Sequence, residues 1–274
     1  MPTDETLLVN AARSGDRAAF GTLVEPLRRP LFGYIYKMVT LRQDAEDLLQ
    51  DVLVRALENL PSFRRESTFK NWLFGIATHV CLDHLRSKKR GRVEAQLIGE
   101  QEASNTPGAP EALRATMAAP DFVFEIREHI AFCFTCLGRT LPPDQQAALL
   151  LREVLGFSAE DAARMMEVSE PVFRHRLADA RASMIGAYEG LCQLINKEGA
   201  CWQCRGLREI APPEHRGPDL VQITVAPGVA VTPESLFDAR LEIVRDSPLE
   251  DGKTRRVHDG FFASLASREE CGGA

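Results

Sequence analysis

Residues 44–57 read DAEDLLQDVLVRAL, and their apolar positions repeat with the period of an α-helix. The stripe consists of Ala45, Leu48, Leu49, Val52, Leu53, Ala56 and Leu57. This spacing places all seven side chains on one face, and Pro61 then predicts the end of the helix. Asp44, Asp47 and Asp51 lie on the opposite side. Such an acidic face is either solvated and stabilised by the helix dipole or a docking surface for a basic partner, and the pattern leaves both open.

The same helical spacing recurs on both sides of this stretch. It returns in residues 69–80, and two earlier segments, 20–27 and 31–38, are separated by Pro30. Residues 93–119 are rich in Ala, Pro, Gly, Ser, Thr and Glu and predict a linker. Helical patterning resumes at Phe122 and continues to about Asn196, whereas LVQITVAPGVAVTPESL (220–236) and LEIVRD (241–246) resemble short strands.

These patterns predict a mainly α chain of two small helical domains joined by a flexible linker, with a small α+β C-terminal extension. The predicted boundaries are 1–92, 93–121, 122–196 and 197–274. The formal net charge is −6, and the start of the chain lacks the basic and apolar segments of a signal peptide. No apolar run reaches the length of a membrane span, so we expect a cytoplasmic protein without membrane insertion. We find no glycine-rich phosphate loop and no nucleophile–base motif, and expect no enzymatic activity.

A basic island stands out within this acidic chain. Residues 63–92, FRRESTFKNWLFGIATHVCLDHLRSKKRGR, contain eight Lys and Arg against two acids. Lys and Arg at this density suit phosphate contacts, and aromatic side chains can stack on unpaired bases. Ser67, Thr68, Lys70 and Asn71 are suited to reading a base edge. Phe69 and Trp72 lie on or beside the apolar stripe, so each is either a core residue or a base platform.

The order of DAEDLLQDVLVRAL and FRRESTFKNWLFGIATHVCLDHLRSKKR closely resembles region two of bacterial extracytoplasmic-function (ECF) sigma factors, over most of residues 7–90. The resemblance implies that Asp44, Asp47, Gln50 and Asp51 bind the clamp helices of RNA polymerase. It implies that the loop 63–71 captures a flipped base of the minus-ten element, and that the helix carrying His79, Asp83 and Arg86 approaches the upstream edge of that element. The candidate DNA-binding residues of this region are Arg64, Arg65, Ser67, Thr68, Lys70, Asn71, His79, Asp83, Arg86, Lys88, Lys89 and Arg90.

Residues 141–184 have the pattern of a helix-turn-helix. Ser158 and Asp161 form a capping signature for one helix, and Ser169 can cap the next, with Pro171 in its first turn. We expect a small core of Ala162, Ala163, Met166, Val168, Val172 and Leu177. The segment resembles region four of the same sigma factors, which implies that Arg174, His175, Arg176 and Arg181 face a major groove. Where the turn of that family carries Gly, this chain has Glu167, and a left-handed Glu costs about 1 kcal/mol.

Four of the seven cysteines form two Cys-x-x-Cys pairs, Cys133/Cys136 and Cys201/Cys204. On a helix, His129, Cys133 and Cys136 share one face, and four thiolates, or three with His129, suit zinc. Three interpretations stay open: buried core cysteines, a zinc site that staples the tail to region four, or a reversible thiol switch.

The function predicted from the sequence is that of a sigma factor, whose partners are core RNA polymerase and promoter DNA, with an anti-sigma factor as a further candidate. We also predict that the acidic C-terminal extension regulates it. The alternatives are a redox or zinc protein that uses the cysteine pairs, and a helix-turn-helix regulator that does not bind polymerase.

Overall fold

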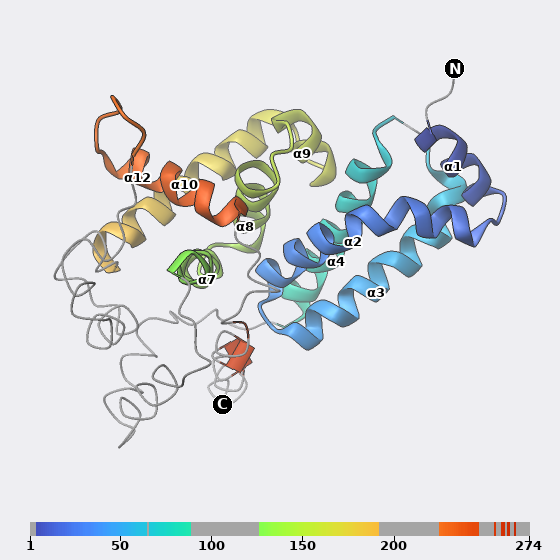
Figure 1. The fold of residues 1–274 in the computed structure, drawn as a ribbon, viewed down its shortest axis with the longest axis horizontal. Helices are drawn as coiled ribbons and strands as arrows, with labels where there is room; N and C mark the ends of the chain where they lie inside the picture. Colours follow the sequence, from blue (N-terminus) through green and yellow to red (C-terminus); the bar gives the residue numbers. More distant parts are fainter. Residues whose placement is uncertain are drawn as a thin grey trace. The chain divides into compact units, whose positions relative to one another are not determined.

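The computed structural model describes residues 4–64, 66–88, 126–191 and 225–246, together with six residues between 255 and 266. The elements in these ranges are α1 (Asp4–Arg13), α2 (Arg17–Val39), α3 (Arg42–Asn59), the 3₁₀ turn η1 (Leu60–Ser62), α4 (Phe69–Ser87), α7 (Ile126–Gly138), α8 (Pro143–Leu149), the π-helical turn η2 (Leu150–Val154), α9 (Ala159–Met165), α10 (Glu170–Leu191) and α12 (Pro233–Asp246) (Figure 1). All regular structure described is helical, which confirms the prediction of a mainly α chain. The predicted linker, 93–119, lies outside the described residues.

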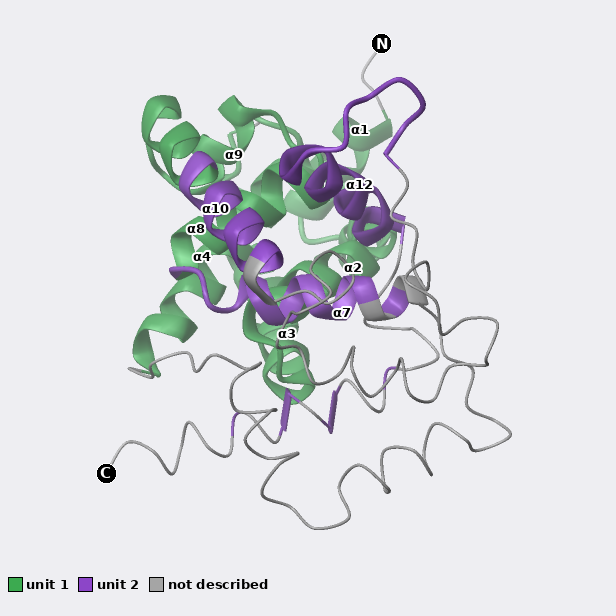
Figure 2. Ribbon diagram, turned by 90° about the vertical axis from the view of Figure 1, so that its left-hand side faces the viewer, with its two compact units in different colours: residues 1–90, 143–177 green, residues 91–142, 178–274 purple. Residues whose placement is uncertain are grey.

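The chain forms two compact units (Figure 2). Unit 1 contains residues 1–90 and 143–177, and unit 2 contains residues 91–142 and 178–274. Each unit therefore combines segments that are far apart in the sequence, and α10 begins in the first and ends in the second. The domain boundaries drawn from the sequence stay a prediction.

In unit 1, α2 runs through a proline at which the sequence predicted a break. It begins where the Asp16 carboxylate accepts hydrogen bonds from the Ala18 and Ala19 amides (2.9 and 3.1 Å) and continues through Pro30 to Val39. The prediction of two segments separated by Pro30 is wrong. A proline removes one helical hydrogen bond, and the fully buried side chains of Leu31, Ile35 and Met38 hold the helix in place despite that loss.

Helix α3 carries the predicted apolar stripe. Ala45, Val52 and Ala56 are fully buried, while Leu57, at the end of the stripe, is 38% exposed. The stripe packs against α2 and α4, and the helix ends at Asn59, just before Pro61, as predicted. The helical prediction for this stretch is thus confirmed, with buried residues from Ala45 to Ala56.

Helix α4 is anchored by a buried polar pair within an apolar core. Thr78 donates a hydrogen bond to the Phe74 carbonyl (2.8 Å), so the Tyr34 hydroxyl donates to Thr78 Oγ1 (3.0 Å). Cys81 lies next in this core and is fully buried. Burial raises the pKa of the Cys81 thiol. The pKa of Tyr34 is also raised, mainly by burial and to a smaller extent by the nearby Cys81.

The helix-turn-helix of residues 158–177 is formed as the capping signature predicted. Ser158 Oγ accepts a hydrogen bond from the Asp161 amide (3.0 Å), which begins α9. Glu167 has φ 52°, in the left-handed region where its family counterpart is Gly. The predicted core is wrong at Val172, which is 43% exposed, because the following residue, Phe173, is the one that α10 turns inward.

Unit 2 contains a helix where the sequence predicted a strand. Residues 241–246 belong to α12, and the residues described from 225 to 232 form turns. Phe237, Arg240, Leu241 and Val244 are buried at i, i+3, i+4 and i+7, the period of a helix. The predicted α+β extension is therefore wrong at LEIVRD, while residues 220–224 of the other predicted strand lie outside the described residues.

The buried face of α12 packs against α7. Phe237 lies 6.4 Å from Phe134 of α7 and 6.2 Å from Tyr188 of α10, measured between ring centroids. Further along the tail, Phe262 lies 5.1 Å from Phe132. The extension thus contributes to one apolar core with α7 and the end of α10. None of the described helices is long and apolar enough to cross a membrane.

Candidate nucleic-acid and polymerase interface

One face of α3 presents polar side chains to solvent. Asp47, Gln50 and Asp51 are exposed at i, i+3 and i+4, and none of them forms a hydrogen bond or ion pair with another described residue. Val54, 54% exposed, extends this face by one turn. The sequence pattern did not indicate Val54 as part of this face, because the face was recognised by its polar residues and Val54 is apolar. Val54 nevertheless lies outside the buried stripe.

Asp44 differs from the other three members of the predicted polymerase-binding set. Its side chain is 23% exposed, and its Oδ2 accepts a hydrogen bond from Lys88 and lies 3.2 Å from His84 Nε2. These contacts join the first turn of α3 to the last turn of α4. The structure thus separates an exposed trio from a carboxylate that holds the two helices together.

The loop before α4 is supported by three aromatic rings. The Phe63 centroid lies 4.8 Å from Trp72 and 6.3 Å from Phe69. Phe69 is buried, so it belongs to the core, whereas Trp72 is half-buried. Thr68 caps α4 by accepting a hydrogen bond from the Asn71 amide (3.1 Å), and the exposed Arg64 precedes it. The three rings pack together beneath this loop.

Along α4, the predicted DNA-facing side chains contact either residues of the segment 157–167 or one another. Lys70 Nζ lies 4.7 Å above the Phe157 ring, and His79 Nε2 lies 3.5 Å from Glu167. Asp83 and Arg86 are about two-thirds exposed and pair with each other at 3.1 Å. The remaining candidates, Arg65, Lys89 and Arg90, lie outside the described residues.

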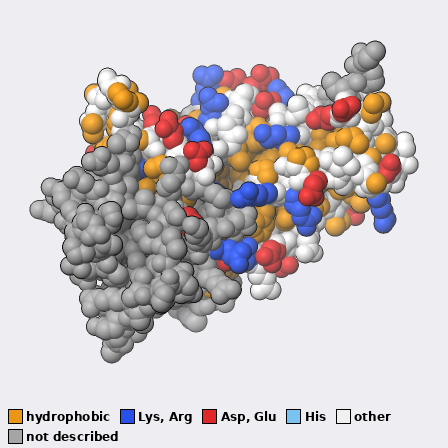
Figure 3. Space-filling model, viewed as in Figure 1, with side chains coloured by type: hydrophobic (Ala, Val, Ile, Leu, Met, Phe, Trp, Pro, Cys, Tyr) orange, Lys and Arg blue, Asp and Glu red, His pale blue; other side chains and the backbone are white. Residues whose placement is uncertain are grey.

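Each of the three predicted arginines on α10 pairs with an acid. Arg174 Nε donates to Glu170 (2.9 Å), one turn earlier, and Arg176 contacts Asp144 (3.0 Å). Arg181 donates to Asp238 of α12 (2.7 Å). His175 is exposed beside them. On the visible face of the described residues, acidic and basic side chains are interspersed (Figure 3).

The predicted metal ligands are divided between described and undescribed parts of the chain. Cys136 is buried and Cys133 half-buried in α7. The side chain of His129, and both Cys201 and Cys204, lie outside the described residues. Within the described ranges no three His, Cys, Asp or Glu side chains gather as metal ligands. A zinc site that joins the two pairs stays a prediction.

Comparison with known proteins shows the family to which the chain belongs. The Sigma-70 region 2 model matches residues 23–91, and the Sigma-70, region 4 model matches residues 132–184. The RNA polymerase sigma-H factor of Pseudomonas aeruginosa is 30% identical over 184 residues, which are 67% of this chain and 93% of that protein. The chain belongs to the ECF sigma factors. The ECF RNA polymerase sigma factor SigM of Mycobacterium tuberculosis is 30% identical over 65% of this chain and 81% of its own length.

Other members of the family differ in length. The ECF sigma factor SigG of Mycobacterium tuberculosis is 31% identical over 61% of this chain, and the match spans only 48% of SigG. Two solved structures cover most of their own chains: the sigma factor RpoE in complex with the anti-sigma factor NepR from Bartonella quintana (22% identity, TM-score 0.43, 65% of this chain and 97% of RpoE) and CnrH in complex with the cytosolic domain of CnrY (22%, 0.46, 68% and 97%). Helix α12 begins well beyond residue 184, where the match to the region 4 model ends.

Proposed function

We propose that this ECF sigma factor is an interchangeable subunit that directs core RNA polymerase to its promoters and catalyses no reaction of its own. The observation that carries the proposal is the exposed trio of α3, Asp47, Gln50 and Asp51, in the same compact unit as the predicted DNA-facing helix α4. A sigma factor needs both surfaces, because it must hold polymerase and DNA at once. A sigma factor of this kind works in the cytoplasm.

The trio is suited to a basic partner. Charges that have no partner among the described residues are available for an interface, where electrostatic complementarity speeds association and selects the partner. Asp44 contributes less directly, since its carboxylate already pairs with Lys88. We assign Asp47 and Asp51 as the electrostatic contacts and Val54 as an apolar contact on the same face.

On α4 and the preceding loop, the side chains supply what unpaired promoter DNA requires. Arg64, Lys70 and Arg86 offer charge to phosphates, and such contacts weaken as salt rises. Ser67 and Asn71 offer hydrogen bonds to a base edge above the Phe63–Trp72 pair. On α10, Arg174 and His175 are exposed near the helix start, the part of a recognition helix that reaches base edges.

Charge reversal on α3 tests the proposal. The variant Asp47→Lys/Asp51→Lys should lose binding to core polymerase and promoter-directed transcription, and should keep or strengthen binding to free DNA. Glu25→Lys, at an exposed acid on α2, is the control for a charge reversal away from α3. Unchanged polymerase binding in the double variant would exclude the assigned surface. If the chain is instead a helix-turn-helix regulator that acts without polymerase, the wild-type protein should bind DNA and form no complex with polymerase.

We further propose that the extension restrains region four. The supporting observation is that Asp238 of α12 holds Arg181 at 2.7 Å, while the Arg181 guanidinium lies 5.1 Å above the Phe237 ring. A carboxylate in this position competes with DNA phosphate for the same cation. Replacing Asp238 by Asn removes the competitor and leaves Phe237 in the core. Promoter binding that does not change in this variant would argue against the restraint.

A further inference from the structure

Helix α1 lies ahead of residue 23, where the match to the region 2 model begins, yet it contacts the loop that we assign to a flipped base. Glu5, Val9 and Arg13 recur at i, i+4 and i+8, so they lie along one side of the helix. Val9 is buried, and α1 packs against α2. The charged side chains before and after Val9 reach the two ends of the loop before α4.

The Glu5 carboxylate caps the beginning of α4. Its Oε1 accepts a hydrogen bond from the Phe69 amide (3.2 Å), which is 64 residues away in the sequence. Phe69 is the first residue of α4, and the first amides of a helix have no partner within that helix. The helix dipole also favours a negative charge at this end. Glu5 thus fixes the point at which the loop becomes helical.

Arg13 holds the other end of the same loop. Its guanidinium donates a hydrogen bond to the Pro61 carbonyl (2.9 Å) in η1, and α1 contacts η1. The Phe63 amide closes this turn by donating to the Leu60 carbonyl (3.1 Å). Both ends of the loop between Pro61 and Phe69 are therefore held by side chains of one helix.

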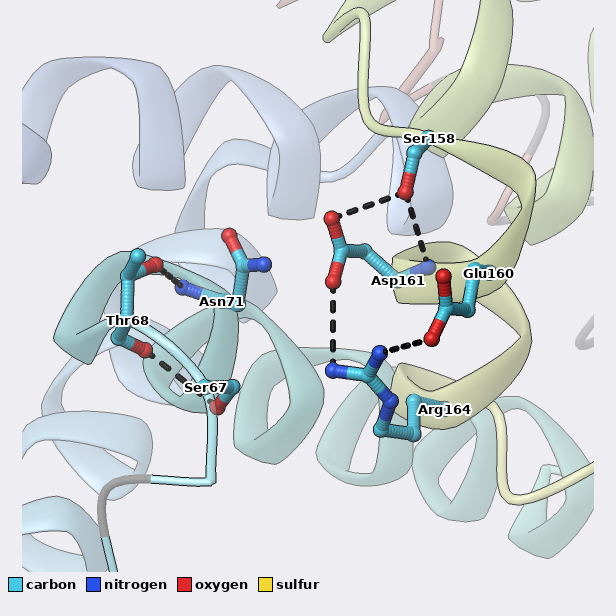
Figure 4. Close-up of polar contacts among 7 residues, drawn as sticks. All are labelled: Ser67, Thr68, Asn71, Ser158, Glu160, Asp161 and Arg164. Carbon is cyan, nitrogen blue, oxygen red and sulfur yellow. Dashed lines mark hydrogen bonds and ion pairs between the residues drawn. The ribbon is translucent and has the colours of Figure 1, made fainter.

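The side chains that we assign to a base edge depend on this support. Figure 4 shows that Thr68 Oγ1 accepts the Asn71 amide, whereas the side chain of Asn71 has no partner among the described residues. The Ser67 hydroxyl reaches the neighbouring Thr68 carbonyl at 3.4 Å, and no other element holds it in the part of the chain that the structure describes. The backbone beneath Ser67 and Asn71 therefore sets where these two side chains lie.

We infer that α1 is a positioning element for minus-ten recognition, in which Glu5 and Arg13 set the geometry of the base-capture loop without contacting DNA. This inference rests on the assignment of the loop under the proposed function. Contacts to bases specify a sequence only when the groups that make them are held in place. A loop released at one end still carries Arg64 and Lys70, so it keeps its attraction for phosphates. Loss of either α1 contact should therefore weaken sequence preference more than transcription as a whole.

Transcription by core polymerase with the full chain tests the inference. The template is a library of randomised promoters, and the sequenced start sites give the base preferences of the minus-ten and minus-thirty-five elements separately. In Glu5→Ala and in Arg13→Gln, the preference at the captured minus-ten base should fall by about threefold to tenfold, the effect expected for one hydrogen bond. The minus-thirty-five preferences should not change, because neither substitution touches region four.

Asp4→Ala and Arg17→Gln are the matched controls. Each removes the same charge as its test variant from an exposed side chain that has no partner among the described residues. Glu5→Gln keeps an acceptor oxygen for the Phe69 amide and should recover most of the preference that Glu5→Ala loses. The two test variants act through separate hydrogen bonds, so either one decides the question if the other does not fold.

Minus-ten preferences equal to those of the controls overturn the inference. An equal loss of preference at both elements also overturns it, because general damage to the folded chain produces that result. By contrast, a wild type that adds no start sites to those of core polymerase refutes the proposed function itself, whatever the α1 variants show.

Discussion

The Asp238→Asn variant isolates the restraint that α12 places on α10. The substitution keeps the size of the side chain. It removes the negative charge of the carboxylate that accepts a hydrogen bond from the Arg181 guanidinium at 2.7 Å. The core contacts of Phe237 remain. The Arg181 side chain is 26% exposed and that of Asp238 59% exposed, so water and salt screen the pair.

The expected gain in DNA binding follows from that exposure. Ion pairs of this kind contribute about 0.2–1 kcal/mol. If DNA must replace Asp238 at Arg181, loss of the competitor lowers the dissociation constant of the promoter complex by a factor of about 1.4 to 5. Because the restraint is itself screened, the gain should shrink as the salt concentration rises.

The assay is promoter binding by polymerase reconstituted with each variant, titrated at two salt concentrations. Glu234→Gln is the matched control: it removes an exposed acid one turn earlier in α12, where the carboxylate has no partner among the described residues. The double variant Arg181→Gln/Asp238→Asn completes a mutant cycle, in which Asp238→Asn should have no effect once Arg181 is absent.

Two results would refute this reasoning. An equal gain in Asp238→Asn and Glu234→Gln would show that only the overall charge matters. A full gain in the Arg181→Gln background would show that Asp238 acts on some other group.

Three further predictions concern stability and metal content. Because burial raises the Cys81 pKa, the folded thiol stays protonated while the unfolded one ionises, so the free energy of unfolding should fall as pH rises above about 8.5; urea unfolding from pH 7 to 10 should show a weaker decline in Cys81→Ala, and an identical slope would contradict this. Glu167→Gly should raise the free energy of unfolding by about 0.5–1 kcal/mol by relieving the left-handed backbone at φ 52°; a loss of stability in the same unfolding assay would show that the His79 contact matters more. Elemental analysis of reduced protein should find about one zinc per chain, absent from Cys201→Ser/Cys204→Ser; folded, reduced protein without zinc would leave the cysteines to the core or to thiol chemistry.

Local sequence patterns predicted the elements whose partners lie nearby. The α3 stripe and the Ser158–Asp161 cap both follow from residues within a few turns of each other, so spacing alone was sufficient. The strand predicted at 241–246 failed for a related reason. Its helical period becomes visible only with Phe237 and Arg240 included, and a buried arginine does not count as a core residue in a hydrophobic pattern.

The contacts between distant segments could not be predicted in this way. Arg181 and Asp238 are 57 residues apart, and Lys70 meets Phe157 across the predicted linker. Nothing in the spacing around either residue indicates the partner, because each contact depends on how distant helices pack. The same holds for Asp44. In the sequence it has the same charge as Asp47 and Asp51, and nothing in the spacing indicates that it alone pairs with Lys88.

The most direct test of the central claim is transcription by core RNA polymerase, with and without this chain, on a library of randomised promoters, with the 5′ ends of the transcripts sequenced. The account predicts that the chain adds new start sites that share one minus-ten and one minus-thirty-five element, and that Asp47→Lys/Asp51→Lys abolishes them. Start sites identical to those of core polymerase alone, from protein shown to be folded, would contradict it.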